Sequence, residues 1–295
     1  MCGIVGLFLK QDAMRPKLGE MLCDMLVTMT DRGPDSAGIA IYGDAADGVK
    51  ITVQSDAGTI AFEGLDRTLS EALGAAVTVR TVDTHAVIVV PPELEEVAVI
   101  ALEQRGLRIM ASGVAMEIYK EVGLPRDVAA RFGLRGMGGS HGIGHTRMAT
   151  ESAVTTLGAH PFSTARDQCL VHNGSLSNHN QMRRKLARRG VKTRTENDTE
   201  VGAAYISSRM ADGATLGEAL EGTLRDLDGF FTFVTGTRNG FGVVRDPIAC
   251  KPAVMAETDA LVAFASEYRA FADLPDIGHA RVWEPEPATV YFWER

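Results

Sequence analysis

A cysteine in the second position is the first residue of this chain whose type and place could do chemistry. Cys2 stands between the initiator Met1 and Gly3, so removal of Met1 by an aminopeptidase would leave a free α-amine beside a thiol. The amine could then act as general base for the thiol of the same residue. In the simpler interpretation, Cys2 is only a small apolar residue at the start of a core strand. Taken alone, the position favours the simpler interpretation.

The sequence His172-Asn173-Gly174 could supply the hydrogen-bond donors that a nucleophile of this kind needs. An oxyanion formed in acyl transfer is commonly stabilised by a backbone N–H and a side-chain amide in a water-poor pocket. We expect a strand over 168–171, which would place the Asn173 side chain and the Gly174 amide at a sheet edge, where glycine permits close approach. An ordinary turn at a strand end would have the same composition.

Arg147 and Asp198 carry the two charges that would hold an amino-acid substrate. An α-carboxylate needs a cation and an α-ammonium needs an anion, because burying either charge unpaired is costly. Arg147 lies at the end of an apolar predicted strand, where a buried arginine requires a partner. Asp198 has an alternative role as the N-cap of a helix, since Asn197-Asp198-Thr199-Glu200 reads as a helix start.

Short strands and clustered helices must position these residues. The patterns predict strands at 3–8, 36–42, 141–147 and 168–172, and helices at 17–30, 179–189 and 198–210. The C-terminal part predicts a hairpin of 230–235 with 241–245, followed by strands at 260–265 and 288–293. This arrangement favours an α+β layered sandwich over a doubly wound parallel sheet.

Residues 45–135 differ from the segments on either side. A strand at 84–90, an amphipathic helix at 92–105 and a strand at 107–111 predict one β-α-β unit, inserted into a single domain that spans 1–295. The glycine-rich run at 136–142 precedes a strand instead of joining a strand to a helix, which argues against a dinucleotide-binding loop. We interpret this run as a flexible approach to a site.

Composition excludes several classes of function. The formal net charge of −8 and an aromatic content of 6% give no sign of a nucleic-acid groove. The basic run 183–189 is expected to be a solvated helix face, with a phosphate or an acidic partner as the alternative. No apolar window is long enough for a membrane span, and we expect a cytoplasmic protein.

The four cysteines are too widely spaced for a zinc ribbon, an iron-sulfur site or a disulfide framework, so we expect no metal. Cys23 falls on an apolar helical stripe, and Cys169 and Cys250 lie in or beside strand-like segments. We therefore expect these three cysteines to be buried small hydrophobes, unlike Cys2.

Six motifs in fixed order resemble the class II, N-terminal-nucleophile glutamine amidotransferases. They are Met1-Cys2-Gly3-Ile4-Val5-Gly6, Arg32-Gly33-Pro34-Asp35, Gly144-His145-Thr146-Arg147, Ala159-His160-Pro161-Phe162, His172-Asn173-Gly174 and Asn197-Asp198-Thr199-Glu200. Later segments also fit, among them Leu227-Asp228-Gly229-Phe230, Arg245-Asp246-Pro247 and Ala265-Ser266-Glu267. Apart from the insertion, the resemblance covers nearly the whole chain.

The resemblance implies a four-layer α-β-β-α sandwich that hydrolyses glutamine through a γ-glutamyl thioester and releases ammonia. It also implies roles for six residues, as nucleophile (Cys2), oxyanion donors (Asn173 and Gly174), ligand of the α-carboxylate (Arg147), ligand of the α-ammonium (Asp198) and supporting residue (Arg32). The charge types required by an amino-acid substrate agree with these roles.

Members of the family normally pass ammonia to a synthase domain, so the resemblance implies a partner chain here. The length and the insertion resemble the amidotransferase subunit of glutamate-synthase-like complexes such as N-methylglutamate synthase, whose substrate would be glutamine or glutamate. No cofactor is expected in this chain, while FMN is expected in a partner subunit. The alternatives are a Cys-type acylase, which would need an apolar acyl pocket, and a non-catalytic scaffold subunit.

Two departures from the family pattern concern the substrate pocket. Met148 replaces the aromatic residue that commonly follows the carboxylate-binding arginine, and Glu151-Ser152-Ala153 replaces the usual continuation. The sequence therefore predicts a pocket that differs from the family pattern around the substrate.

Overall fold

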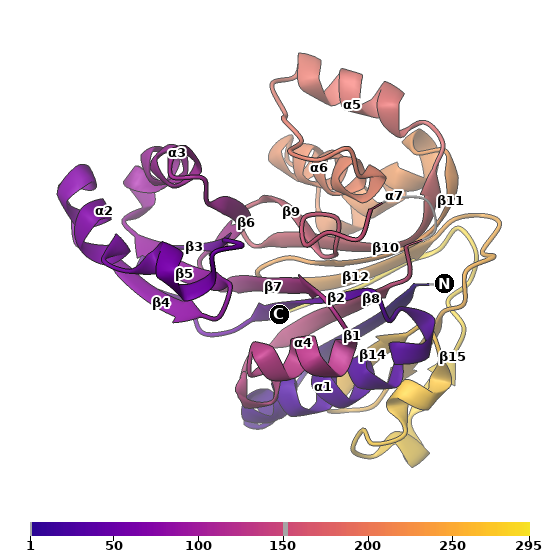
Figure 1. Cartoon of the computed structure of the whole chain (residues 1–295). Coiled ribbons are helices and arrows are strands. Elements are labelled where there is room, and N and C mark those ends of the chain that lie inside the picture. The colour runs from indigo at the N-terminus through magenta and orange to yellow at the C-terminus, as the bar shows by residue number, and fades with distance from the viewer. Residues whose placement is uncertain (1, 150–152) are drawn as a thin grey trace.

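Within residues 2–149 and 153–295, which the computed structural model describes, the strands form sheets of seven, five and four strands. Every neighbouring pair of strands is antiparallel. The larger two sheets pack face to face, as Figure 1 shows. We call them the β1 sheet and the β10 sheet, and the four-stranded one the inserted sheet.

The β1 sheet contains the strand that begins beside Cys2. Its order is β15 (Arg281–Trp283), β13 (Val254–Glu257), β14 (Leu261–Ala265), β1 (Gly3–Leu9), β8 (His141–Arg147), β2 (Ser36–Tyr42) and β7 (Met116–Val122). Helices α1 (Leu18–Thr28) and α4 (Pro125–Arg131) cover its outer face.

The β10 sheet carries the proposed oxyanion residues. Its order is β16 (Val290–Glu294), β12 (Gly240–Arg245), β11 (Gly229–Gly236), β10 (Gln168–Leu176) and β9 (Phe162–Ala165). Helices α6 (Asp198–Ala211) and α7 (Leu216–Asp226) pack on its outer face, and α5 (His179–Arg188) packs on α6. The layers follow the order α-β-β-α, which confirms the predicted α+β sandwich. Short 3-10 helices occupy Asp12–Lys17, Thr30–Arg32, Gly58–Phe62, Pro92–Leu94, Leu134–Gly136, Tyr268–Phe271 and Ile277–His279.

Strand β1 shows why the sequence forms this sandwich. All seven of its residues are buried, because it lies at the centre of a covered sheet. Val5 and Leu7 pack toward α1, whereas Ile4 and Phe8 pack between the two sheets. Burial of each such side chain stabilises the fold by about 1.5–3 kcal/mol. Successive side chains of β1 point to opposite faces of the sheet, and because both faces are covered, the whole strand is apolar.

The inserted sheet is larger than the predicted β-α-β unit. Its order is β4 (Thr78–Val82), β5 (His85–Val90), β3 (Val49–Gln54) and β6 (Arg108–Gly113), with α2 (Leu65–Leu73) and α3 (Glu95–Gln104). The prediction found β5, α3 and β6, but β3 lies between the two strands and pairs with both. The result is the β-α-β-β-α-β order of a ferredoxin-like split unit. We call residues 49–113 the inserted module.

The C-terminal boundary of the insertion differs from the expected residue 135. Strand β7 pairs with β2 inside the β1 sheet, and α4 covers that sheet with α1. Both elements lie within 45–135 but belong to the main sandwich. Sequence patterns could not separate them, because strand pairing between residues this far apart leaves no local signal.

Two further expectations were wrong. Cys250 is exposed, because the side chain of Arg245 donates to the carbonyl oxygens of Ala249 and Lys251 and leaves the residue between them facing outward. The glycine run 136–142 leads into the start of β8, whereas Arg147 ends that strand, so the run is no approach to the site. Hydrogen bonds from the amides of Gly19 and Gly139 also fasten the run to the first helices.

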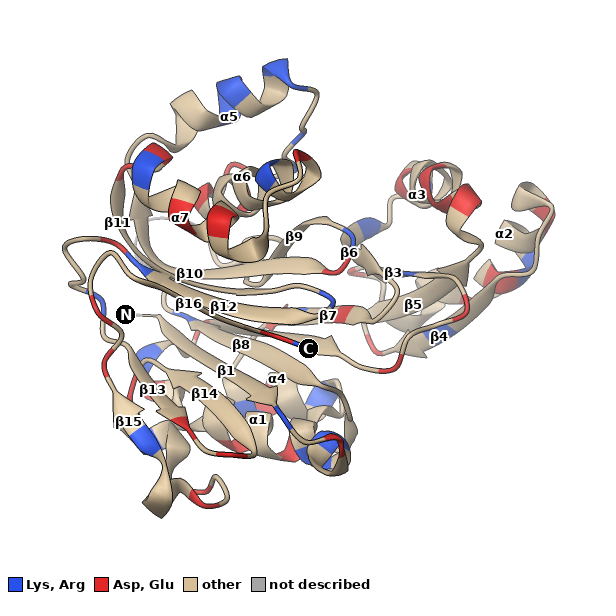
Figure 2. Ribbon diagram, turned by 180° about the vertical axis from the view of Figure 1, so that it is seen from behind, with Lys and Arg blue, Asp and Glu red and all other residues tan. Residues whose placement is uncertain are grey.

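Other expectations about the surface agree with the structure. Cys23 and Cys169 are buried. In the basic run only Leu186 is buried, and Figure 2 shows Lys and Arg along α5, which confirms a solvated face. No helix in the described part of the chain has the length and apolarity needed to cross a bilayer.

Candidate active site

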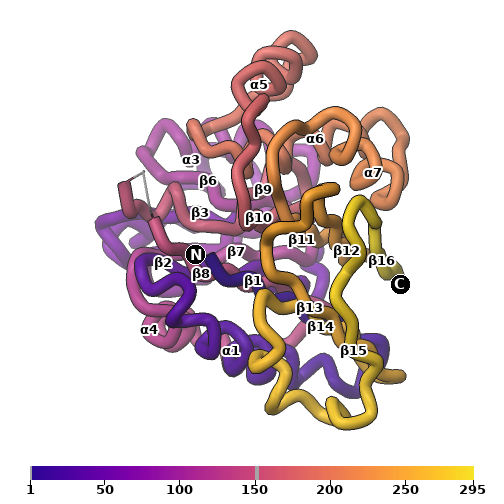
Figure 3. Tube along the Cα trace, turned by 90° about the vertical axis from the view of Figure 1, so that its right-hand side faces the viewer, coloured from indigo at the N-terminus to yellow at the C-terminus, as the bar shows by residue number. Residues whose placement is uncertain are grey.

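Cys2 is held at the end of the β1 sheet where the two sheets meet. In Figure 3 the start of β1 lies beside β8 and beneath β10. Two hydrogen bonds of 2.9 Å fix this end, from the Ile4 amide to Ser266 Oγ and from the Ser266 amide to the Ile4 carbonyl. Cys2 itself is partly exposed. Met1, on whose removal the predicted nucleophile depends, lies outside the described residues.

Gly3 is required by the packing next to Cys2. A Cβ added at Gly3 would lie 2.8 Å from Thr146 Oγ1 and 2.9 Å from Met29 Cβ. Real Cβ atoms do not come so close to other atoms, so a larger residue would displace the start of β1. The absence of a side chain at Gly3 therefore helps to set the position of Cys2.

Arg32 binds the backbone of Cys2. Its buried guanidinium donates from Nε to the Cys2 carbonyl oxygen at 3.0 Å and from Nη1 to Glu267 Oε1 at 2.9 Å. The hydrogen bond from Arg32 lowers the pKa of Glu267 below its ordinary value, so this carboxylate stays charged opposite the guanidinium. Arg32 thus fixes the backbone of Cys2, while its supporting role in a reaction stays a prediction. The partner Glu267 was not among the predicted site residues, although Ala265-Ser266-Glu267 is a family segment.

Asn173 reaches the same carbonyl oxygen from the other sheet. Its side-chain Nδ2 donates to the Cys2 carbonyl oxygen at 3.3 Å. Asn173 and Gly174 lie inside β10 and not in a turn after it, opposite Thr232 and Phe231 of β11. Strand β9 pairs with β10 only at Gln168 and Leu170, so the other edge of β10 is open at Asn173.

The backbone conformation of Gly174 excludes other residues. Its φ of +148° lies in the region that L-amino acids with side chains rarely adopt. An added Cβ would lie 1.9 Å from the carbonyl oxygen of Phe230. The exposed Gly174 therefore offers a backbone N–H beside Asn173 that no side chain of its own can cover.

Arg147 lies next to Cys2 through strand register. Gly3 pairs with Thr146, so the next residues outward on the antiparallel strands, Cys2 and Arg147, lie at the same end of the sheet. The buried Arg147 donates from Nη1 to the carbonyl oxygen of Ala153 at 3.4 Å. Its strand neighbour Met148 is partly exposed, while residues 151–152 of the predicted departure lie outside the described residues.

Asp198 is the first residue of α6, and Asn197 is the N-cap, since the Asn197 side chain accepts a hydrogen bond from the Thr199 amide. The N-cap alternative for Asp198 was therefore wrong. Its Oδ2 accepts from the Leu176 amide at 2.9 Å, and its Oδ1 lies 3.7 Å from His172 Nδ1. Burial raises the pKa of Asp198, but the interactions with His172 and the Leu176 amide outweigh burial and lower the pKa to about 2. Asp198 is thus an anion, placed by β10 rather than by contact with Cys2.

A row of buried histidines joins the two sheets behind these residues. The rings of His145 and His160 stack at 4.1 Å, and His145 Nε2 lies 3.1 Å from the carbonyl oxygen of His172. Thr199 Oγ1 contacts both His160 Nε2, at 2.8 Å, and His172 Nδ1, at 3.1 Å. Burial lowers the pKa of His145 to about 3 and that of His160 well below its ordinary value. His145 and His160 are therefore uncharged, and the contacts of the row fix the positions of β8, β10 and α6.

Sequence comparisons agree with this arrangement. Residues 145–273 match the glutamine amidotransferase domain family. The glutamine amidotransferase-like protein GlxB of Rhizobium meliloti is 66% identical, covering 100% of this chain and 98% of that protein. A protein of Methanothermobacter thermautotrophicus is 33% identical, covering 99% of each chain.

Structural comparison gives the same fold. The solved structure of glutamine phosphoribosylpyrophosphate amidotransferase from B. subtilis superposes with a TM-score of 0.63 at 20% sequence identity. The superposition covers 99% of this chain and 47% of that one. At this identity the similarity concerns the fold alone.

Proposed function

This chain belongs to the glutamine amidotransferase family, and from that premise we propose that it hydrolyses the side-chain amide of glutamine with Cys2 as nucleophile. The observation that carries the proposal is the hydrogen bond of 3.3 Å between Asn173 Nδ2 and the Cys2 carbonyl oxygen. It places a side-chain amide of one sheet against the backbone of the partly exposed Cys2 on the other. Acyl transfer to a thiol needs such a donor near the reacting carbon, which supports the proposal.

The reaction follows from the groups at this end of the sandwich. After removal of Met1, the α-amine of Cys2 accepts the thiol proton, and Sγ attacks Cδ of glutamine. The negative charge that develops on the amide oxygen is stabilised by Asn173 Nδ2 and the Gly174 N–H. The C–N bond breaks, the leaving nitrogen takes the proton from the α-ammonium, and ammonia departs. Water then attacks the γ-glutamyl thioester, the thiol regains its proton, and glutamate is released.

The charges of Arg147 and Asp198 support an amino acid as substrate. Arg147 would bind the α-carboxylate and Asp198 the α-ammonium, each as a charge-assisted pair in a partly buried site. Asp198 is suited to this role because its pKa of about 2 keeps it charged across the physiological range. An acylase for an apolar acyl group would gain nothing from these two charges.

We propose that the ammonia is consumed by a partner chain of the glutamate-synthase-like type, as in N-methylglutamate synthase, with FMN bound by the partner. The partner's identity rests on the sequence resemblance.

Labelling with the glutamine analogue 6-diazo-5-oxo-L-norleucine tests the nucleophile. Intact mass should show loss of Met1 and one adduct, which peptide mapping should place on Cys2. The variant Cys2→Ala should take no label. Cys250→Ser is the matched control, because Cys250 is exposed and distant in sequence from the site, and it should label like the wild type.

Retention of Met1, or no adduct on Cys2 in the presence of co-purified partners, would refute hydrolysis by this chain. The partner proposal has its own readout, the flavin absorbance of proteins that co-purify with the tagged chain. Co-purification of flavin-free chains alone would overturn the partner proposal but not the hydrolysis.

A further inference from the structure

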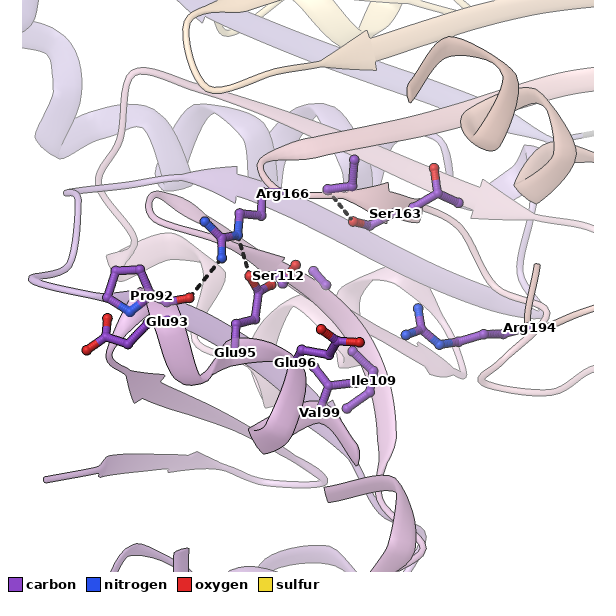
Figure 4. Close-up of a pocket in the computed structure, with 13 residues that line it drawn as sticks. Pro92, Glu93, Glu95, Glu96, Val99, Ile109, Ser112, Ser163, Arg166 and Arg194 are labelled. Carbon is purple, nitrogen blue, oxygen red and sulfur yellow. Dashed lines mark hydrogen bonds and ion pairs between the residues drawn. The ribbon is translucent and has the colours of Figure 1, made fainter. Parts of the chain in front are cut away.

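A cavity of about 480 Å³ lies between the inserted module and the main sandwich. Figure 4 shows its walls: α3 and β6 of the module on one side, and β9 with the loop that carries Arg194 on the other. It is a different site from that of Cys2, whose contacts involve β1, β10 and Arg32. Its volume is in the range of cavities that bind small molecules.

Opposite charges face each other across this cavity without forming an ion pair. In Figure 4 the carboxylate of Glu96 and the guanidinium of Arg194 point toward one another. Neither Glu96 nor Glu93 has a hydrogen-bond or ion-pair partner among the described residues, and Arg194 has a single side-chain contact there, to Glu103 at 3.4 Å. An anion and a cation held apart in this way leave room for a ligand that carries both charges.

Arg166 has a different role in the wall. Its Nε donates to Glu95, and its Nη2 donates to the carbonyl oxygen of Pro92 at 3.1 Å. These contacts link the end of β9 to the first turn of α3 and to Pro92 before it, and so they connect the two walls of the cavity. The groups that remain for a ligand are the carboxylates of Glu93 and Glu96 and the two Nη atoms of Arg194, whose Nε contacts Glu103.

Apolar side chains line the cavity between the charges. Val99, Ile109 and Ala111 are buried or half-buried there, and Figure 4 shows Val99 and Ile109 next to Glu96. A flexible apolar side chain of a ligand would cover this surface, at about 25 cal/mol for each Å² removed from water. The lining thus combines an anion, a cation and an apolar patch.

We propose that this cavity binds a free α-amino acid with an apolar side chain as a regulatory ligand. Its α-ammonium would pair with Glu96 and its α-carboxylate with Arg194, while the side chain would pack on Val99 and Ile109. Each end of the zwitterion thereby meets an opposite charge, which a simple anion or a simple amine would not achieve.

The ligand would act on the active site through two segments that it contacts. The Arg194 amide donates to Glu200 Oε1 at 2.7 Å, which fastens this loop to α6, the helix that begins with Asp198. Strand β9 follows His160, whose Nε2 contacts Thr199 of the same helix. If glutamine and this ligand both prefer one arrangement of the loop and β9, each raises the affinity for the other by the same factor.

Isothermal titration calorimetry on the full chain, treated first with the diazo-norleucine to block the glutamine pocket, tests the proposal. The probe is L-leucine, with isoamylamine and 4-methylpentanoate as analogues that each lack one of its charges. L-Leucine should bind at one site per chain, and each analogue at least tenfold more weakly. Arg194→Gln and Glu96→Gln should each weaken L-leucine binding tenfold or more, whereas Arg184→Gln on the exposed face of α5 should leave it unchanged.

Three outcomes would overturn the proposal. In the first, the wild type binds neither L-leucine nor L-methionine at millimolar concentration, and in the second it binds 4-methylpentanoate as tightly as L-leucine. In the third outcome, the Glu96 and Arg194 variants bind L-leucine as tightly as the wild type does. Thermal unfolding of each variant shows whether it is folded. Binding is measured without turnover, so its failure does not touch the proposed hydrolysis. If Cys2 takes no label, the dependence on Glu96 and Arg194 still reports on this cavity.

Discussion

Arg32 and Glu267 lie 235 positions apart in the chain and form an ion pair of 2.9 Å that holds the guanidinium against the carbonyl of Cys2. Arg32 lies in the 3-10 helix after α1, and Glu267 follows β14, the strand that pairs with β1. The ion pair therefore joins these two segments next to the start of β1. The start of β1 is therefore fixed by contacts from both flanks. The position of the proposed nucleophile depends on this pair as well as on its own strand.

Breaking this pair should slow the reaction without unfolding the chain. We expect Arg32→Met and Glu267→Gln to lower kcat/KM for glutamine by about ten- to a hundredfold, because a charge-assisted hydrogen bond contributes about 1.5–3 kcal/mol. Steady-state glutaminase assays measure this. Arg189→Met is the control, since Arg189, directly after α5, forms an ion pair of 2.6 Å with Asp212 at the opposite end of α6 from Asp198. A similar loss in the control would contradict the assignment.

Asn173→Ala should lower kcat rather than raise KM. The amide is expected to bind the oxyanion of the transition state, and loss of one such donor lowers kcat by about 10²–10³-fold. The measurement is the steady-state rate at saturating glutamine. Asn180→Ala, at an exposed position of α5, should have no effect. An unchanged kcat with a raised KM would show that Asn173 binds the ground state instead.

Arg147→Gln and Asp198→Asn should impair recognition of the amino acid but not the reactivity of the thiol. We expect each variant to take up the diazo-norleucine label about tenfold or more slowly, because one charge of the zwitterion loses its partner. Iodoacetamide carries neither charge, so its rate of reaction with Cys2 should change little. The comparison is best made in a Cys250→Ser background, since Cys250 is exposed and would also react. Equal slowing with both reagents would exclude a recognition role.

Acid should destabilise the fold between pH 6.5 and about 3. Burial lowers the pKa of His85, His141 and His145 to about 3, so between these pH values the unfolded chain binds protons that the folded chain does not. Stability therefore falls as pH falls, by roughly 2 kcal/mol per histidine at pH 5. Urea unfolding at pH 7.5 and pH 5 measures the loss.

The variant His85→Phe isolates one contribution to this effect. It should lose less stability between pH 7.5 and pH 5 than the wild type does, because Phe has no proton to bind. The exposed His279→Phe should behave as the wild type. If the stability of His85→Phe fell with pH as much as that of the wild type, the burial of His85 would not contribute to the loss of stability in acid.

The sequence predicted best where pattern and chemistry are local. Strand β8 has the predicted bounds, because seven successive residues are buried between a helix and a second sheet. Cys2, Arg32 and Asn173 were predicted from motifs, and the structure brings these three into contact. The roles of all six residues in the reaction stay predictions.

Features that depend on distant partners could not be predicted in the same way. Strand β4 is largely exposed, and the alternation of apolar and polar residues in β3 does not reveal its place between β5 and β6. Cys250 looks apolar in sequence, yet the hydrogen bonds of Arg245 to its neighbours turn it outward. Glu267 also gives no local signal of its pairing with Arg32.

The register between β2 and β7 shows how the module is attached to the sandwich. Tyr42 and Met116 are directly paired, and the Gly43 amide donates to the Ala115 carbonyl oxygen at 3.1 Å. The chain thus leaves the main sheet after Gly43 and returns to it at Ala115, and these two residues are hydrogen-bonded to each other. The whole module stands where a tight hairpin turn would otherwise be. A two-residue turn in its place would leave every strand pairing of the sandwich intact, but it would uncover the sides of Tyr119 and Phe132 that His85 contacts.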